Sequence, residues 1–194
     1  MKITPKEDGK HQVQLTRDGE EFLPGRELGT AADIDWAKRK QKASIIVEVV
    51  MLVMQVVGIA VIVSIETMKA KIEDTVEAIK KSAALQSAIN KFISSWKEAG
   101  RQGNVMSKAE AILNLLVDIQ SAGGYLLTII KSLCEEMPWL DWVKTVAMAT
   151  ALIIAGLETD VIVFAVVEKA VHFKQKVDNV VKLEEIEQTR WKST

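Results

Sequence analysis

The run Ala43-Ser-Ile-Ile-Val-Glu-Val-Val-Met-Leu-Val-Met-Gln-Val-Val-Gly-Ile-Ala-Val-Ile-Val-Ser-Ile65 is apolar apart from small serines and two interruptions, Glu48 and Gln55. A helix from Ile45 to Ile65 would measure about 30 Å, because each helical residue adds about 1.5 Å. That length matches the hydrocarbon core of a bilayer. It also suits the central helix of a bundle. The segment therefore either crosses a membrane or is enclosed by other helices.

The composition of the whole chain is that of a folded globular protein. Of 194 residues, 48% are hydrophobic and 26% charged, so one domain can hold its core without a disulfide or a metal. A formal net charge of −1 argues against nucleic acid as a partner. The single cysteine, Cys134, cannot form an intramolecular disulfide, and we expect it to be buried as a small apolar side chain.

Long helices are expected because the only prolines, at positions 5, 24 and 138, leave residues 25–137 without the strongest helix breaker. The first helix should begin at the capping pattern Thr30-Ala-Ala-Asp33 and continue to about Ser64. A third should open with the capping box Ser107-Lys-Ala-Glu110 and kink or divide at Gly123-Gly124. The remaining helices are expected at 67–99, from 139 onward and at 171–191.

A second apolar stretch covers residues 142–173 and is interrupted by Glu158 and Asp160. Ionised carboxylates at these positions would hinder insertion into lipid, and their neutralisation in acid would permit it. We expect the pair either to act as an acidic gate or to mark a turn or an exposed face.

The amino-terminal residues have a different pattern. His11–Thr16 alternates polar and apolar residues, and Asp18-Gly19 is typical of a hairpin turn. A lone hairpin is marginal in water, so it must pack on the helices or extend a sheet in another subunit. The predicted fold is all-α, a bundle of about five mostly long helices over residues 30–194 with a concealed apolar helix at 43–65. A small β-hairpin arm occupies residues 1–29.

Gln41, Glu48 and Gln55 are spaced by seven residues and share one face of the apolar helix. In a bundle this stripe would hydrogen-bond in the core or reach the rim. In a membrane it would face a pore lumen or a partner helix, because a charged side chain in lipid costs about 2.5–3.5 kcal/mol on insertion scales.

Basic residues precede the apolar run, and tryptophans lie near predicted helix ends. Lys38, Arg39, Lys40 and Lys42 would attract anionic head groups, or would only solubilise the start of the helix. Tryptophans near helix ends are typical of membrane interfaces and also of core contacts. The five are Trp36, Trp96, Trp139, Trp142 and Trp191.

Catalytic patterns are absent from the sequence. It has no glycine-rich phosphate loop, no Cys-x-x-Cys pair and no nucleophile elbow, and the two histidines lack the paired Glu-x-x-His motifs of a di-iron bundle. We expect a protein that is not an enzyme and that uses no cofactor and no metal.

Long helices, a concealed apolar segment and acidic residues within a second one resemble the architecture of the α-helical pore-forming toxins and translocation domains. The resemblance implies a protein that is soluble as made and later inserts into a membrane. The polar amino terminus is not a secretory signal peptide, so we expect release or delivery to target membranes by another route.

The function predicted from the sequence is membrane binding and pore formation, with a homo-oligomer or a companion subunit. The insertion contacts would be Met51, Val53, Met54, Val57 and Ile59. The alternative is a non-enzymatic interaction module, such as a dimer, an inhibitor or an immunity-type partner, in which the apolar helix is permanent core. A third hypothesis, a carrier of an apolar ligand, would need a cavity between the two apolar segments.

Overall fold

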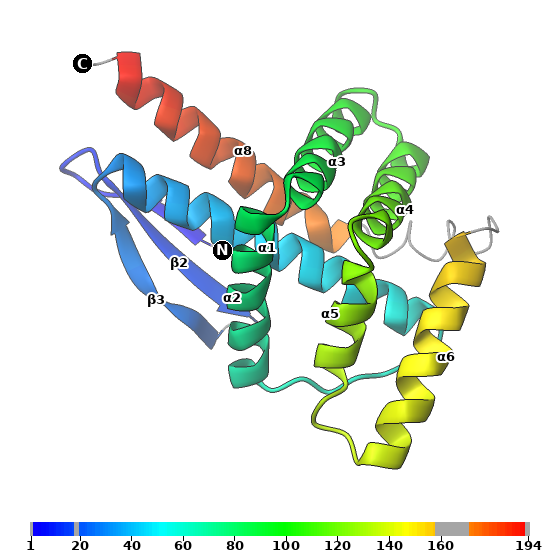
Figure 1. Ribbon diagram of the computed structural model, residues 1–194. Helices are drawn as coiled ribbons and strands as arrows, with labels where there is room; N and C mark the ends of the chain where they lie inside the picture. Colours follow the sequence, from blue (N-terminus) through cyan, green and yellow to red (C-terminus); the bar gives the residue numbers. More distant parts are fainter. Residues whose placement is uncertain (1, 18–19, 158–170, 193–194) are drawn as a thin grey trace.

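The computed structural model describes residues 2–17, 20–157 and 171–192. These residues form a three-stranded sheet and seven helices, so the protein is predominantly helical, as the sequence predicted (Figure 1). The expected number of about five helices is too low, because two of the expected long helices are each divided. The helices are α1 (Ala31–Val56), α2 (Ile65–Lys81), α3 (Ala83–Arg101), α4 (Val105–Ser121), α5 (Tyr125–Leu133), α6 (Trp139–Leu157) and α8 (Val171–Lys192).

The amino-terminal sheet has one strand more than the predicted hairpin. Strands β1 (Lys2–Pro5), β2 (His11–Arg17) and β3 (Glu20–Leu28) are antiparallel in the order β1-β2-β3. The turn between β1 and β2 places Gly9 at a φ of 77°, a conformation that glycine adopts at little cost. Pro5 closes the short edge strand, where the missing backbone donor is tolerated.

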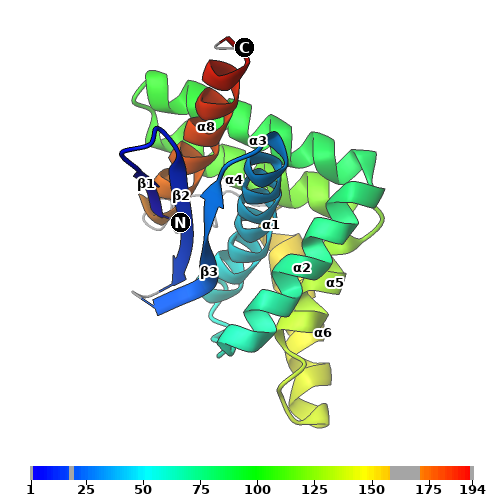
Figure 2. The same ribbon diagram turned by 90° about the vertical axis from the view of Figure 1, so that its left-hand side faces the viewer.

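The sheet packs on the helices of the same chain. Val13 and Leu28 of the sheet form a small core with Ile34 and Ala37 of α1 and Leu183 of α8, and none of the five is more than 4% exposed. Figure 2 shows the sheet along one side of α1, with α8 beside it. Packing within one chain, one of the two expected solutions for the marginal strands, is the one observed for Val13.

Helix α1 begins where the sequence predicted but ends early. The Thr30 hydroxyl accepts the Asp33 N–H at 3.2 Å, and the Asp33 carboxylate accepts the Thr30 N–H at 2.9 Å, a complete capping box. At the other end Gly58 has a φ of 85°, and its N–H and that of Ile59 bond back to the carbonyls of Gln55 and Met54. This is a Schellman motif, and it terminates the helix at Val56. The predicted single helix over 43–65 is therefore wrong, since the chain leaves the helix before residue 57.

The expected helix at 67–99 is two helices, α2 and α3. Ser82 has an extended backbone, and its hydroxyl accepts the Leu85 N–H at 3.2 Å as the N-cap of α3. Serine competes for backbone donors in this way, which favours the first turn of a new helix over the interior of a long one.

Two predictions about α4 have different outcomes. The Gly123-Gly124 pair divides the expected helix, with φ values of 75° and 74°, and α5 leaves at 101° to α4. The predicted capping box at Ser107 is wrong. Asn104 is the N-cap, because its side-chain oxygen accepts the Ser107 N–H at 3.2 Å, and the helix begins at Val105.

The main core surrounds α1, which runs through the middle of the molecule from the sheet toward α6 (Figure 1). Helices α2, α5 and α8 contact it, and α3 and α4 pair beside them. Cys134 is fully buried in this core, as expected, and burial raises the pKa of its thiol.

Candidate functional site

The apolar segment of α1 is enclosed by its neighbours. The side chains of Val53, Met54 and Ile59, predicted as insertion contacts, are at most 5% exposed, while Met51 and Val57 are half-buried at the edge of the main core. In this conformation these residues are core contacts. A function in lipid would require the bundle to open.

The predicted polar stripe on α1 faces α8 over part of its length. Glu48 forms an ion pair with Lys176 of α8 and accepts a hydrogen bond from the Ser44 hydroxyl at 3.2 Å. The Gln41 amide nitrogen lies 3.5 Å from the Lys176 carbonyl, while its buried oxygen has no hydrogen-bond partner among the described residues. Gln55 is exposed. The stripe is therefore mainly a contact between helices in this conformation.

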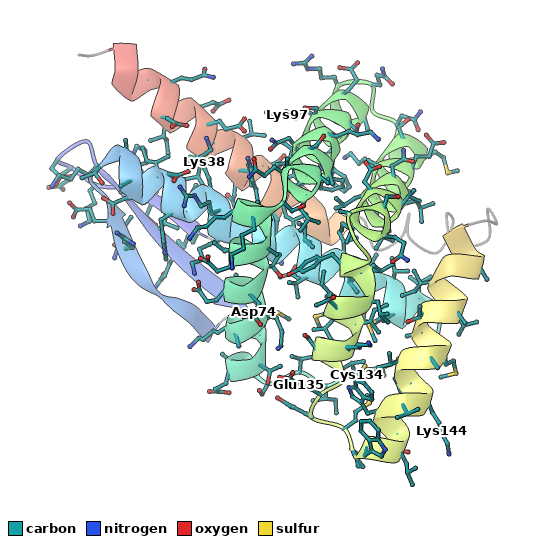
Figure 3. The ribbon with its side chains drawn as sticks, in the orientation of Figure 1. Lys38, Asp74, Lys97, Cys134, Glu135 and Lys144 are labelled. Carbon is teal, nitrogen blue, oxygen red and sulfur yellow. The ribbon has the colours of Figure 1, made fainter. Side chains whose placement is uncertain are left out.

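Two more ion pairs join the polar side of α8 to α1 and α3. Lys38 of α1 lies 2.7 Å from Glu187, and Lys97 of α3 lies 3.0 Å from Glu184. The inner side of α8 buries Val177 and Val180 completely. Helix α8 is thus held on α1 and α3 by ion pairs and apolar packing together, and Figure 3 labels Lys38 and Lys97, the two lysines of these pairs.

The four basic residues before the apolar run do not form one exposed patch. Lys38 pairs with α8, Arg39 pairs with Asp35 on its own helix, and Lys40 is buried against Glu73 of α2. The Lys42 ammonium donates to the Asn90 side chain of α3 at 2.9 Å. Burial, with a contribution from the charge of Lys38, lowers the pKa of Lys42.

An exposed apolar surface lies on α6, which occupies one edge of the molecule and contacts α5 and α1 on its inner side (Figure 1). Its inner residues Val146, Ala149 and Ile153 are buried. Its outer residues are called the α6 outer face below. They are Leu140 (71% exposed), Val143 (42%), Met148 (51%) and Leu152 (41%), with the exposed alanines 147, 151 and 155.

Polar groups are concentrated at the first turns of α6. Trp139 is 71% exposed and stacks on Trp142 at 5.3 Å between ring centroids, and the Trp142 indole N–H donates to the Lys131 carbonyl at 3.1 Å. Asp141 and Lys144 are exposed nearby, whereas the sequence from Thr145 to Leu157 contains no charged residue (Figure 3). The helix therefore has an aromatic and charged beginning followed by a long apolar face.

The tryptophan side chains differ in their exposure to solvent. Trp96 is buried against Phe92 at a centroid distance of 5.5 Å, and Trp36 is half-buried with the Arg26 guanidinium 4.9 Å from its ring. Of the tryptophans whose side chains are described, Trp139 alone is exposed. The side chain of Trp191 lies outside the described part.

The predicted acidic gate, Glu158 and Asp160, lies outside the described residues, as does most of the stretch that follows α6. Within the described ranges, the structure has no group of three histidine, cysteine, aspartate or glutamate side chains that could hold a metal ion.

The α6 outer face is the main candidate surface that the sequence did not identify. The apolar composition of residues 142–173 was visible in the sequence, but it does not show whether a neighbouring helix covers these residues. The residues predicted to insert lie instead in or at the edge of the core, within α1 and just after it, and the exposed apolar face belongs to α6.

No single described helix is long and apolar enough to cross a bilayer, although α4 from Met106 and α5 satisfy the length and composition criteria together across their 101° bend. Comparisons with protein-family models, curated proteins and solved structures found no match to this chain.

Proposed function

We propose that this protein binds membranes through the α6 outer face and perforates them as an oligomer after α1 leaves the bundle. The observation that carries the proposal is the uncovered apolar surface of α6, with Leu140, Val143, Met148 and Leu152 all at least 41% exposed. Burial of one such side chain contributes about 1.5–3 kcal/mol relative to full exposure, so several together favour partition into a lipid interface.

The arrangement of polar residues favours a lipid occupant over a protein one. Exposed Trp139 and Lys144 lie together at the beginning of the apolar face, where an indole and an ammonium would meet the head groups. Beyond them, α6 itself has no charged residue from Thr145 to Leu157 that could orient a protein partner.

Insertion of α1 would be a second step. The helical part of the apolar run, Ile45 to Val56, spans only about 18 Å at 1.5 Å per residue, short of a bilayer core. The segment from Val57 to Ser64 would have to join it, and this segment contains Ile62, whose side chain is 92% exposed. Insertion therefore requires both loss of the α8 cover and extension of the helix beyond Gly58.

The interaction module remains a second candidate, and one observation favours it. The half-buried ion pair and the apolar contacts of α8 on α1 form a closed core that a protein with permanent structure would also have. In that case the α6 outer face would meet another protein chain rather than lipid.

The first experiment compares dye release and co-sedimentation with neutral and anionic liposomes, at neutral and mildly acidic pH. The test variant is Met148→Glu with Leu152→Glu, and the control is Ser94→Glu with Ser95→Glu on the exposed side of α3. Both add two negative charges at exposed helical positions. The proposal predicts that only the α6 variant loses binding and leakage while both keep the wild-type Tm.

A fluorophore on Ile62→Cys, in a Cys134→Ala background, tests the second step, because its emission shifts to the blue if residues 57–64 enter lipid. Lack of liposome binding by the wild-type protein under all these conditions would contradict the proposal. An oligomer that dissociates in the α6 variant would then assign that face to a protein partner.

A further inference from the structure

A pocket of about 330 Å³ is lined by residues of α1, α2 and α3 and by none of α6, and Ile79 and Ile89 form the apolar part of its lining. Its polar lining consists of Arg39 and Lys42 of α1, Lys80 of α2, and Gln86 and Asn90 of α3. They come from two separate parts of the sequence, residues 39–42 and 80–90. Because α2 ends and α3 begins at Ser82, both of these helices contribute side chains to the pocket.

Three cations line this pocket and no carboxylate does. Arg39 and Lys80 have carboxylate partners on their own helices, Asp35 and Glu77, the second at 2.6 Å. The partner of Lys42 is the neutral Asn90 amide oxygen. The carboxylates that pair with the cations of the pocket therefore lie outside its lining.

The environment of Lys42 is short of negative charge. Burial and the positive charge of Lys38 lower its pKa, and the carboxylates of Glu184, Asp35 and Glu187 offset only part of this effect. An anion in the pocket would stabilise the charged ammonium. The Asn90 amide accepts from Lys42 through its oxygen, which leaves its NH2 group able to donate to the same anion.

We propose that this pocket binds a phosphate group, carried either by a lipid head group or by a free phosphate or phosphate ester. A guanidinium fork, two ammonium groups and side-chain amide donors are the chemistry that recognises phosphate oxygens. The pocket volume of about 330 Å³ is at the small end of the range for ligand sites and leaves room for a phosphate group together with part of the molecule that carries it. The lipid form rests on the proposed function, whereas binding of free phosphate does not.

The experiment titrates inorganic phosphate into the protein at constant ionic strength and follows the side-chain amide NMR signals of Gln86 and Asn90. The variants are Arg39→Gln and Lys42→Gln. The control is Arg101→Gln, which removes one positive charge from an exposed side chain at the far end of α3. We expect each pocket variant to weaken phosphate binding about tenfold and the control to bind as the wild type does.

A second arm measures co-sedimentation with phosphatidylcholine vesicles that contain phosphatidic acid, with and without competing inorganic phosphate. Loss of vesicle binding in the pocket variants, and competition by phosphate, assign a lipid head group as the source. Phosphate binding with vesicle affinity unaffected by the pocket variants assigns a free phosphate.

The proposal is overturned if phosphate shifts neither amide signal, or if Arg101→Gln weakens binding as much as the pocket variants do. The α6 double variant keeps the pocket intact. Its loss or retention of vesicle leakage therefore tests the proposed function separately from phosphate binding.

Discussion

Glu48 of α1 and Lys176 of α8 form an ion pair across the interface of the two helices, with side-chain exposures of 26% and 25%. Glu48 is the only charged residue between Ala43 and Ile65. Lys176 neutralises its charge while the adjacent Val47 and Val49 stay fully buried. Helix α8 therefore supplies the counter-ion for the charge within the apolar segment, while α2 and α5 also contact α1.

Loss of one partner of this pair should destabilise the fold. Lys176→Met leaves the half-buried Glu48 carboxylate without its counter-ion. We expect the free energy of unfolding to fall by about 1–2 kcal/mol, a loss between those typical of exposed and of fully buried ion pairs. Urea unfolding followed by circular dichroism measures it. Lys182→Met, at an exposed position of α8, is the matched control. Equal effects of the two substitutions would show that the pair contributes nothing specific.

Glu48→Gln should accelerate leakage from liposomes. The substitution weakens the contact with α8 and also removes a charge that is costly in lipid, so both effects favour release of α1. The rate of dye release per bound protein is the quantity to measure. An unchanged or slower rate would indicate that release of α8 from Glu48 does not limit insertion.

Glu27 should make the sheet sensitive to acid. Hydrogen bonds from Lys10 and then Lys6, each at 2.7 Å, lower the pKa of its carboxyl from 4.5 to about 2. Because the folded-state pKa lies below the unfolded one, the stabilisation is complete above about pH 5 and is lost as the pH falls toward 2. Glu27→Gln should lower Tm at neutral pH, and the difference from wild type should vanish near pH 2. Lys10→Gln should reproduce part of the effect, and a difference that persists at pH 2 would contradict this assignment.

The bend between α4 and α5 should depend on glycine. Gly124→Ala places a Cβ at a φ of 74°, so we expect a loss of about 1 kcal/mol in the free energy of unfolding. Gly100→Ala is the control, because it lies in helical backbone of α3, where alanine should stabilise by about 0.5–1 kcal/mol. An added Cβ meets no atom within 4 Å at either position, so opposite signs would isolate the backbone effect. Thermal unfolding distinguishes the two outcomes.

The position of the α4 cap is open to a direct test. Asn104→Ala removes the acceptor of the Ser107 N–H and should cost about 1 kcal/mol, whereas Ser107→Ala should cost little. Comparison of the two Tm values measures this difference. A larger decrease in Tm for Ser107→Ala than for Asn104→Ala would show that Ser107 is the N-cap, as the sequence predicted.

Helix ends were predictable where a cap or a breaker acts within a few residues. Thr30 with Asp33 and Pro138 before Trp139 marked their helices correctly. Gly58 and Ser82 carried equally local signals, a Schellman glycine and a serine N-cap, which the continuous apolar and amphipathic patterns obscured. The extra strand β1 was not predicted, since four residues ending in Pro5 form a strand only against β2.

The candidate sites depended on tertiary structure to different degrees. The basic residues before the apolar run were predicted as head-group contacts, but the sequence did not show that Arg39 and Lys42 would share a pocket with Lys80. Their partners come from α2 and α3, and no local pattern specifies which helices meet.

By itself the sequence determined that this protein is mostly helical, where several helices begin, and that two apolar stretches must be hidden or used, because periodicity and capping act along one chain segment. Only the tertiary structure decided that the stretch in α1 is covered by α8 and its neighbours while the outer face of α6 remains open. The physical reason is that apolar side chains gain the same free energy from any surface that removes them from water, so the choice of which helix is covered belongs to the packing of the whole bundle.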